Sequence, residues 1–128
     1  MYVCIDTHTL IWYLTNDTRL SSRVESFLFR AEAGELTIVV PIIVLLECMD
    51  IFEKEKVHFD FQTLVLRVTN AQNFIVSALD WTVVLETEQT KGFKDLHDRI
   101  IVATAKLFDA PLLSKDRIIR SMYAKATW

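Results

Sequence analysis

Four acidic residues lie in or directly after apolar stretches of the sequence, where burial of a carboxylate costs free energy. Asp6 and Asp116 each follow a short apolar run that has the character of a buried strand. Glu47 and Asp98 interrupt apolar segments that have helical spacing. A carboxylate in apolar surroundings needs a partner charge or a metal ion. A hard divalent cation, Mg²⁺ or Mn²⁺, prefers oxygen ligands and leaves coordination positions for water and a phosphate oxygen. We therefore predict a metal site formed by these four acids.

Five neighbouring residues are candidates to support such a site. The hydroxyl groups of Thr7 and Ser114 could orient a ligand or a water molecule. Asp95 stands three residues before one of the four acids, so the two share a helix face and Asp95 is either an outer partner or a helix cap. Arg99 and Arg117 each directly follow an acid of the proposed site. We expect all five side chains near the metal.

Short apolar strands alternate with helical patterns along the whole chain. The expected strands cover 1–5, 36–40, 74–76 and 111–114, with a last strand ending at Trp128. The expected helices cover 10–14, 22–33, 41–52, 61–68, 81–87 and 98–107, with Pro41 in the first turn of the third helix. With 128 residues, 2 Gly and 2 Pro, the chain favours one domain over 1–128 and excludes a turn-rich sandwich or barrel.

This alternation predicts a three-layer α/β/α sandwich with a mostly parallel central sheet. In open parallel sheets, functional groups gather at the carboxyl ends of the strands. Asp6 and Asp116 follow strands directly, so we expect them to meet at that edge.

Charge and targeting signals narrow the function classes. The net charge is −3, and without the four candidate acids the remainder carries +1, so a polyanionic substrate stays possible. No apolar stretch reaches the roughly 18 residues of a membrane span, and the basic start of a secretory signal is missing. Two cysteines in apolar runs favour buried thiols over a disulfide framework. We expect a cytoplasmic protein that does not enter a membrane.

Four segments together resemble the PIN-domain family, and most closely the VapC-type ribonuclease toxins of type II toxin–antitoxin pairs. They are Asp6-Thr7-His8-Thr9-Leu10, Leu46-Glu47, Leu96-His97-Asp98-Arg99-Ile100-Ile101-Val102-Ala103-Thr104-Ala105 and Leu113-Ser114-Lys115-Asp116-Arg117-Ile118. The resemblance runs in order through the whole chain.

The resemblance implies a Mg²⁺- or Mn²⁺-dependent endoribonuclease whose acidic quartet is Asp6, Glu47, Asp98 and Asp116. Asp50, three residues after Glu47, is the alternative for the second position. The resemblance also implies an RNA substrate, a cognate antitoxin protein that blocks the cleft, and a homodimer.

Three other functions compete with this hypothesis. A receiver-like phosphoacceptor domain has similar length, but it has paired acids after the first strand, whereas Asp6 stands alone. A phosphatase loop expects an acid where His8 stands. A non-catalytic protein-binding scaffold of the same fold is the third alternative.

Other residue types that suggest chemistry have simpler explanations. The three histidines, at positions 8, 58 and 97, lack zinc-ligand spacing and favour packing or hydrogen bonding. Trp12 and Trp81 could stack on bases, but their helical placement favours core packing or a partner groove. The lysines at positions 54, 56, 91 and 94 could touch phosphates or form a solvated charged face.

Overall fold

A five-stranded parallel sheet forms the centre of the molecule. The computed structural model describes residues 1–128, and the strands lie in the order β3-β2-β1-β4-β5 with every neighbouring pair parallel. The strands are β1 (Tyr2–Ile5), β2 (Thr37–Pro41), β3 (Phe74–Ser77), β4 (Leu112–Leu113) and β5 (Ala126–Thr127). Receiver-like folds have the order 2-1-3-4-5, so the topology excludes that alternative.

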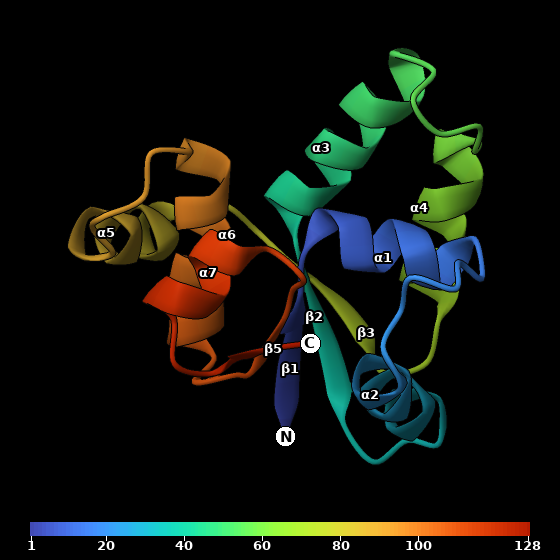
Figure 1. Ribbon diagram of the computed structural model, residues 1–128, viewed down its shortest axis with the longest axis horizontal. Helices are drawn as coiled ribbons and strands as arrows, with labels where there is room; N and C mark the ends of the chain where they lie inside the picture. Colours follow the sequence, from blue (N-terminus) through green and yellow to red (C-terminus); the bar gives the residue numbers. More distant parts are fainter.

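Seven helices cover the two faces of the sheet. They are α1 (Thr7–Leu14), α2 (Ser22–Glu32), α3 (Ile42–Glu53), α4 (Phe61–Asn70), α5 (Trp81–Gln89), α6 (Leu96–Leu107) and α7 (Arg117–Met122). Figure 1 shows α1, α2, α3 and α4 on one side of the strands and α5, α6 and α7 on the other. The predicted three-layer α/β/α architecture is confirmed, and the sheet is wholly rather than mostly parallel.

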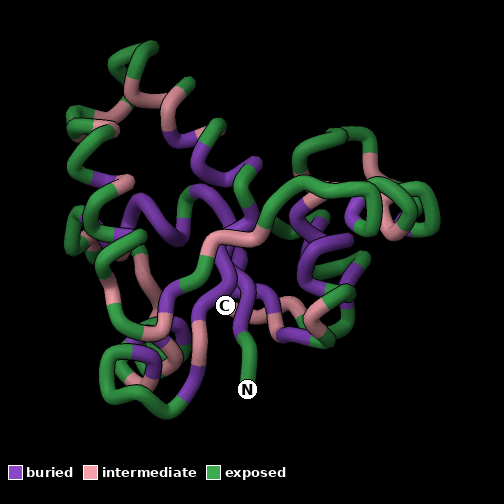
Figure 2. Tube along the Cα trace, turned by 180° about the vertical axis from the view of Figure 1, so that it is seen from behind, coloured by how far each residue is buried: buried purple, intermediate pink, exposed green.

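The two central strands form the most deeply buried part of the core. Val3, Cys4 and Ile5 of β1 and Ile38 and Val39 of β2 are completely buried. Val3 lies opposite Ile38, and Cys4 lies opposite Val39. In Figure 2, the buried part of the tube runs through the middle of the molecule, where these strands lie. Continuous apolar runs are the expected composition of parallel strands that helices cover on both faces.

Polar caps fix where the helices begin. Six of the seven helices have an N-cap side chain that accepts a hydrogen bond from the backbone N–H three residues later, which satisfies a group that the helix itself leaves unpaired. These caps are Asp6, Ser21, Asp60, Asp80, Asp95 and Asp116. Two acids of the predicted metal site therefore also start helices.

Two details differ from the expected elements. Helix α7 was not predicted, because its six residues are too few to show a repeating apolar pattern. Pro41 is the last residue of β2 and precedes α3, so the prediction that it occupies the first turn of that helix was wrong by one position. Both cysteines are buried and unpaired.

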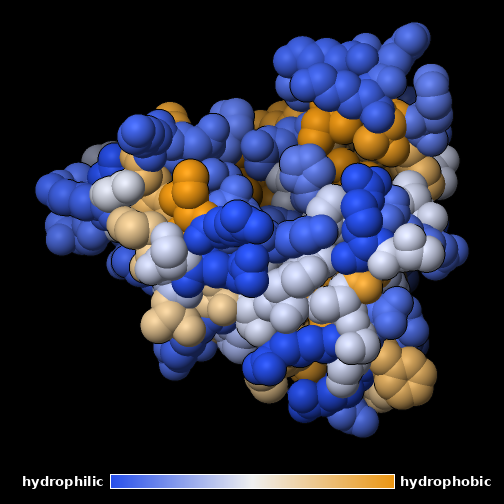
Figure 3. Space-filling view, in the orientation of Figure 1, coloured by the Kyte–Doolittle hydropathy of each residue, from blue (hydrophilic) through white to orange (hydrophobic).

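The outer surface is mixed in polarity. Figure 3 shows hydrophilic side chains over much of this face, with apolar side chains gathered over α3 and α4 below a polar tip. Near the end of α3 and the start of α4, the ring centres of Phe52 and Phe59 are 5.8 Å apart. No helix has both the length and the apolar character that crossing a bilayer requires.

Helix α4 offers a matched test of the core. Leu64 is completely buried, whereas Leu66 is 60% exposed on the same helix. We expect Leu64→Ala to lower the free energy of unfolding by about 2–5 kcal/mol through lost burial and a cavity. Leu66→Ala should change it by less than about 0.5 kcal/mol. Denaturant titration followed by circular dichroism measures both values, and equal losses would contradict this packing of α4.

Candidate metal centre

One small cavity at the carboxyl edge of the sheet is lined by acids from four separate segments. Its volume is about 130 Å³. The acids are Asp6 after β1, Glu47 in α3, Asp98 in α6 and Asp116 after β4. The remaining lining residues are Thr7, His8, Ile51, Ile101 and Ile119. The structure thus brings together the four acids that the sequence singled out, and we call this space the acid cavity.

The strand order explains why the cavity forms there. The chain leaves β1 towards β2 on one side, while β4 lies on the other side of β1. The order of connections therefore reverses between β1 and β4, and a crevice opens at such a switch point. Asp6 and Asp116 stand just beyond these two strands.

Asp6 is the most buried of the four acids, with 7% exposure. Its Oδ1 accepts a hydrogen bond of 2.9 Å from the backbone N–H of Thr9, and the hydroxyl of Ser114 also bonds to its carboxylate. Burial raises the pKa of Asp6, and the hydrogen bonds from Ser114 and Thr9 offset part of that rise. The hydrogen bonds therefore fix the carboxylate of Asp6 in place, but they do not fully offset the cost of burying its charge.

Ser114 connects two of the acids. It is completely buried, and its hydroxyl oxygen accepts a hydrogen bond of 3.1 Å from the backbone N–H of Asp116. Asp116 in turn accepts a hydrogen bond of 2.9 Å from the N–H of Ile119 at the start of α7. The predicted neighbour Ser114 thus positions both Asp6 and the backbone of Asp116.

Two side chains orient Glu47. The hydroxyl of Thr7 donates a hydrogen bond of 2.6 Å to Oε1, and Nδ1 of His97 lies 3.1 Å from Oε2. Asp50, the alternative acid on α3, instead forms an ion pair of 2.7 Å with Lys54 and lies outside the acid cavity. The structure therefore places Glu47, and not Asp50, beside the other three acids.

Among the four acids, Asp98 is the one whose pKa is raised by the charges of the other three. Burial, followed by the charges of Asp95, Asp116, Glu47 and Asp6, raises its pKa to about 6. Asp95 itself caps α6 by accepting a hydrogen bond of 3.0 Å from the N–H of Asp98. Asp95 is thus both a helix cap and a nearby negative charge, but it does not line the cavity.

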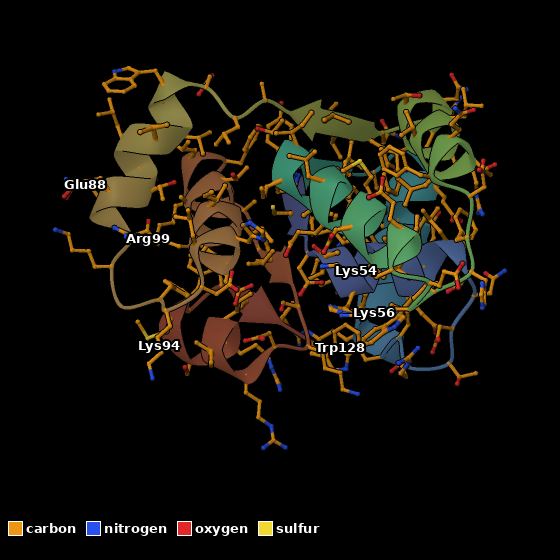
Figure 4. The ribbon with its side chains drawn as sticks, turned by 90° about the horizontal axis from the view of Figure 1, so that it is seen from above. Lys54, Lys56, Glu88, Lys94, Arg99 and Trp128 are labelled. Atoms are coloured by element: carbon orange, nitrogen blue, oxygen red, sulfur yellow. The ribbon has the colours of Figure 1, made fainter.

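The two arginines do not line the acid cavity. Arg99 donates hydrogen bonds to the backbone oxygens of Thr87, Glu88 and Thr90, at 2.6–3.0 Å. It therefore caps the end of α5, and Figure 4 shows it close to Glu88. We expected Arg99 near the metal, but its guanidinium is instead hydrogen-bonded to those carbonyl groups. Arg117 is exposed at the start of α7 and forms no ion pair.

Sequence reasoning assigned no role in the site to three residues that shape the cavity. His8 lines it, and His97 bonds to Glu47. Thr9 is completely buried, and its hydroxyl donates a hydrogen bond of 3.1 Å to the backbone oxygen of Leu113, which ties α1 to β4. The cap at Asp6 predicts a hydrogen bond from the backbone N–H of residue 9. No local signal identifies the hydroxyl bond from Thr9 to Leu113, because the two residues are 104 positions apart.

The donor set fits a hard divalent cation bound partly through water. No Lys or Arg pairs with any of the four acids. No three His, Cys, Asp or Glu side chains are close enough to form a ready-made binding group as they stand. Mg²⁺ usually keeps several waters and takes only one or two carboxylates directly. The chemistry of this donor set therefore suits Mg²⁺ or Mn²⁺ better than a metal that needs several direct protein ligands.

Two larger cavities lie away from these acids. One of about 330 Å³, between α1 and α2, is lined in part by Tyr13, Leu28 and Phe29. Another of about 350 Å³ borders Arg23, Phe27 and the residues around β5. Neither contains an acid of the predicted site.

Comparison with known proteins agrees with the fold. No curated protein matches the chain. A solved structure described as a toxin-antitoxin complex from Klebsiella pneumoniae superimposes with a TM-score of 0.69 at 18% identity, covering 98% of this chain and 96% of that chain. The model of the PIN domain matches residues 3–125. This match covers nearly the whole chain, and the chain therefore belongs to the PIN domain family.

Proposed function

We propose that this protein is a metal-dependent endoribonuclease. The observation that carries the proposal is the convergence of four carboxylates on one small cavity where no Lys or Arg offsets their charge. PIN domains are generally nucleases that use divalent metal ions. A phosphodiester would be repelled by four bare carboxylates, so the bound cation also makes its approach possible.

In this proposal, the chain supplies position and charge. Ser114 and the N–H of Thr9 hold Asp6, while Thr7 and His97 hold Glu47. A bound Mg²⁺ or Mn²⁺ lowers the pKa of a water molecule and neutralises charge on the phosphate oxygens. In the reaction, a water oxygen bonds to phosphorus in line with the leaving ribose oxygen, which departs and takes up a proton.

We further propose that the protein is the toxin of a toxin–antitoxin pair. Support comes from the similar fold of a chain in a toxin-antitoxin complex. The expected partner is an antitoxin protein that covers the acid cavity. A homodimer stays a prediction, to be checked by light scattering.

Asp6→Asn tests the nuclease proposal directly. Asn retains the cap on α1 but removes the charge. We expect cleavage of single-stranded RNA with Mg²⁺ or Mn²⁺ to fall at least about 100-fold, because the metal contributes several kcal/mol to the transition state. A chelator should abolish wild-type cleavage.

Asp50→Asn is the matched control, because it removes an exposed carboxylate of α3 outside the acid cavity. It should cleave RNA like the wild type. Chelator-resistant cleavage, or full activity of a folded Asp6→Asn protein, would overturn the proposal. If the protein bound a partner protein but cleaved no RNA, the alternative of a non-catalytic protein-binding scaffold would be favoured.

Asp98→Asn should stabilise the metal-free protein at neutral pH. The folded pKa of about 6 lies above the unfolded value, so protonation of Asp98 favours the folded state and its charge is unfavourable above pH 6. We expect a gain of about 1 kcal/mol at pH 7.5, after allowing for solvent screening of a half-buried group. The gain should vanish near pH 4.

Thermal and denaturant unfolding with chelator present measures this pH dependence. Asp60→Asn is the control, because hydrogen bonds from Thr63 lower the pKa of Asp60 and removal of its charge relieves no repulsion. Loss of stability by Asp98→Asn at pH 7.5 would contradict the electrostatic description of the acid cavity.

A further inference from the structure

A cluster of aromatic rings and cations lies beside the acid cavity. The ring centres of His8 and Trp12 are 5.8 Å apart, and those of Trp12 and Trp128 are 5.6 Å apart. Nζ of Lys115 lies 5.7 Å from the centre of Trp12 and 6.0 Å from that of Trp128. Cζ of Arg19 lies 4.6 Å from the centre of Trp12. We call these five residues the indole–cation cluster.

The indole–cation cluster is continuous with the acid cavity. His8 belongs to both, because it lines the cavity and its ring packs against that of Trp12 at a tilt of 51°. Lys115 is the residue before Asp116, and consecutive Cα atoms are about 3.8 Å apart. The backbone of Lys115 therefore lies at the rim of the cavity, and its side chain leads from there to the two indoles.

Two members of the cluster are available to a ligand. Arg19 is already paired with Asp17 at 2.7 Å, and Trp12 is 8% exposed. Lys115 is exposed and has no carboxylate within ion-pair distance, and Trp128 is only partly buried. The cluster thus offers one unpaired ammonium group and one accessible indole side by side.

We propose that Lys115 and Trp128 bind the single-stranded RNA next to the scissile phosphate. A neighbouring phosphate pairs with Lys115, and a base stacks on Trp128. This combination of a cation and an aromatic platform is how proteins hold single strands. The inference rests on the proposed nuclease function, since it assigns the path of the substrate as it leaves the acid cavity.

The negative charge of the acid cavity explains why a flanking phosphate would pair with Lys115. The four acids make the cavity repulsive to every phosphate except the one at the metal, so a flanking phosphate needs a cation of its own. Lys54 and Lys91 are already paired with Asp50 and Glu88. Figure 4, seen from above, shows Lys94 at the left of the view, well away from Trp128 near its middle.

RNA binding without cleavage tests the inference. In the Asp6→Asn background, with Mg²⁺ present, fluorescence anisotropy gives the Kd for a short labelled single-stranded RNA. We expect Trp128→Leu to raise that Kd by roughly 5- to 100-fold through lost stacking, and Trp128→Phe to restore most of the affinity. Lys115→Gln should also weaken binding and reduce the slope of log K against log salt by about 0.7, the value for one phosphate contact.

Matched control variants distinguish RNA binding at Lys115 and Trp128 from the general effect of removing an exposed indole or a surface charge. Trp81 is 71% exposed on α5, and Lys94 is exposed before α6 and forms no ion pair. Trp81→Leu and Lys94→Gln should leave the Kd for RNA unchanged. Inorganic polyphosphate, which has no bases, should bind more weakly to Lys115→Gln but normally to Trp128→Leu.

The outcomes distinguish this inference from the nuclease proposal. If wild-type protein cleaves RNA while Lys115→Gln and Trp128→Leu bind RNA as tightly as their parent, the cluster serves packing or a protein partner and the inference is overturned. If the binding pattern holds but wild-type protein cleaves no RNA, the nuclease proposal fails and the binding site stands. Should Trp128→Leu unfold, Trp128→Phe and Lys115→Gln decide the question.

Discussion

The mutual repulsion of four carboxylates in one small cavity is the constraint on which the rest of the structure depends. Burial, followed by the negative charges of the neighbouring acids, raises the pKa of Asp98 to about 6. The chain opposes the repulsion with neutral donors: a buried serine, two threonines and backbone N–H groups hold the acids in place. No Lys or Arg forms an ion pair with any of the four acids. In the proposed metal-bound protein, the cation would offset the repulsion and stabilise the folded state near neutral pH.

A rigid parallel sheet supplies the framework that holds the acids against this repulsion. Strands β1 and β2 are completely buried in their centres, and the reversal of strand order between β1 and β4 creates the crevice. The acids come from the ends of two strands and from two helices, so no single element has to be distorted to bring them together. The hydrogen bond from Thr9 to Leu113 ties α1 to β4 across that crevice. The position of the cavity is therefore set by topology, and its details are set by a few polar side chains.

Much of this arrangement could be predicted from the sequence, because strands buried on both faces are continuous apolar runs and acids that interrupt such patterns are conspicuous. Four of the strands were predicted from apolar runs and six of the seven helices from helical spacing, and the fifth strand lies one residue before its expected end at Trp128. What could not be predicted depends on distant contacts. The hydrogen bond between His97 and Glu47 joins residues 50 positions apart. Arg99 stands next to Asp98 in the sequence, but the helical turn directs its guanidinium towards the end of α5. The packing of Trp128 on Trp12 likewise has no local signal.

Asp6 and Asp116 each start a helix and line the acid cavity with the same carboxylate. A cap requires a short side chain that can fold back onto the third residue of its helix, which aspartate does and the longer glutamate does less well. Glu47 lies within α3 and does not cap a helix, so its extra methylene is free to extend the carboxylate into the cavity. The identity of these three acids is thus determined by reach as well as by charge. Exchange of aspartate for glutamate at the two helix starts would conserve the ionic character of the cavity while loosening the first turns of α1 and α7, so residues of equal charge are not interchangeable there.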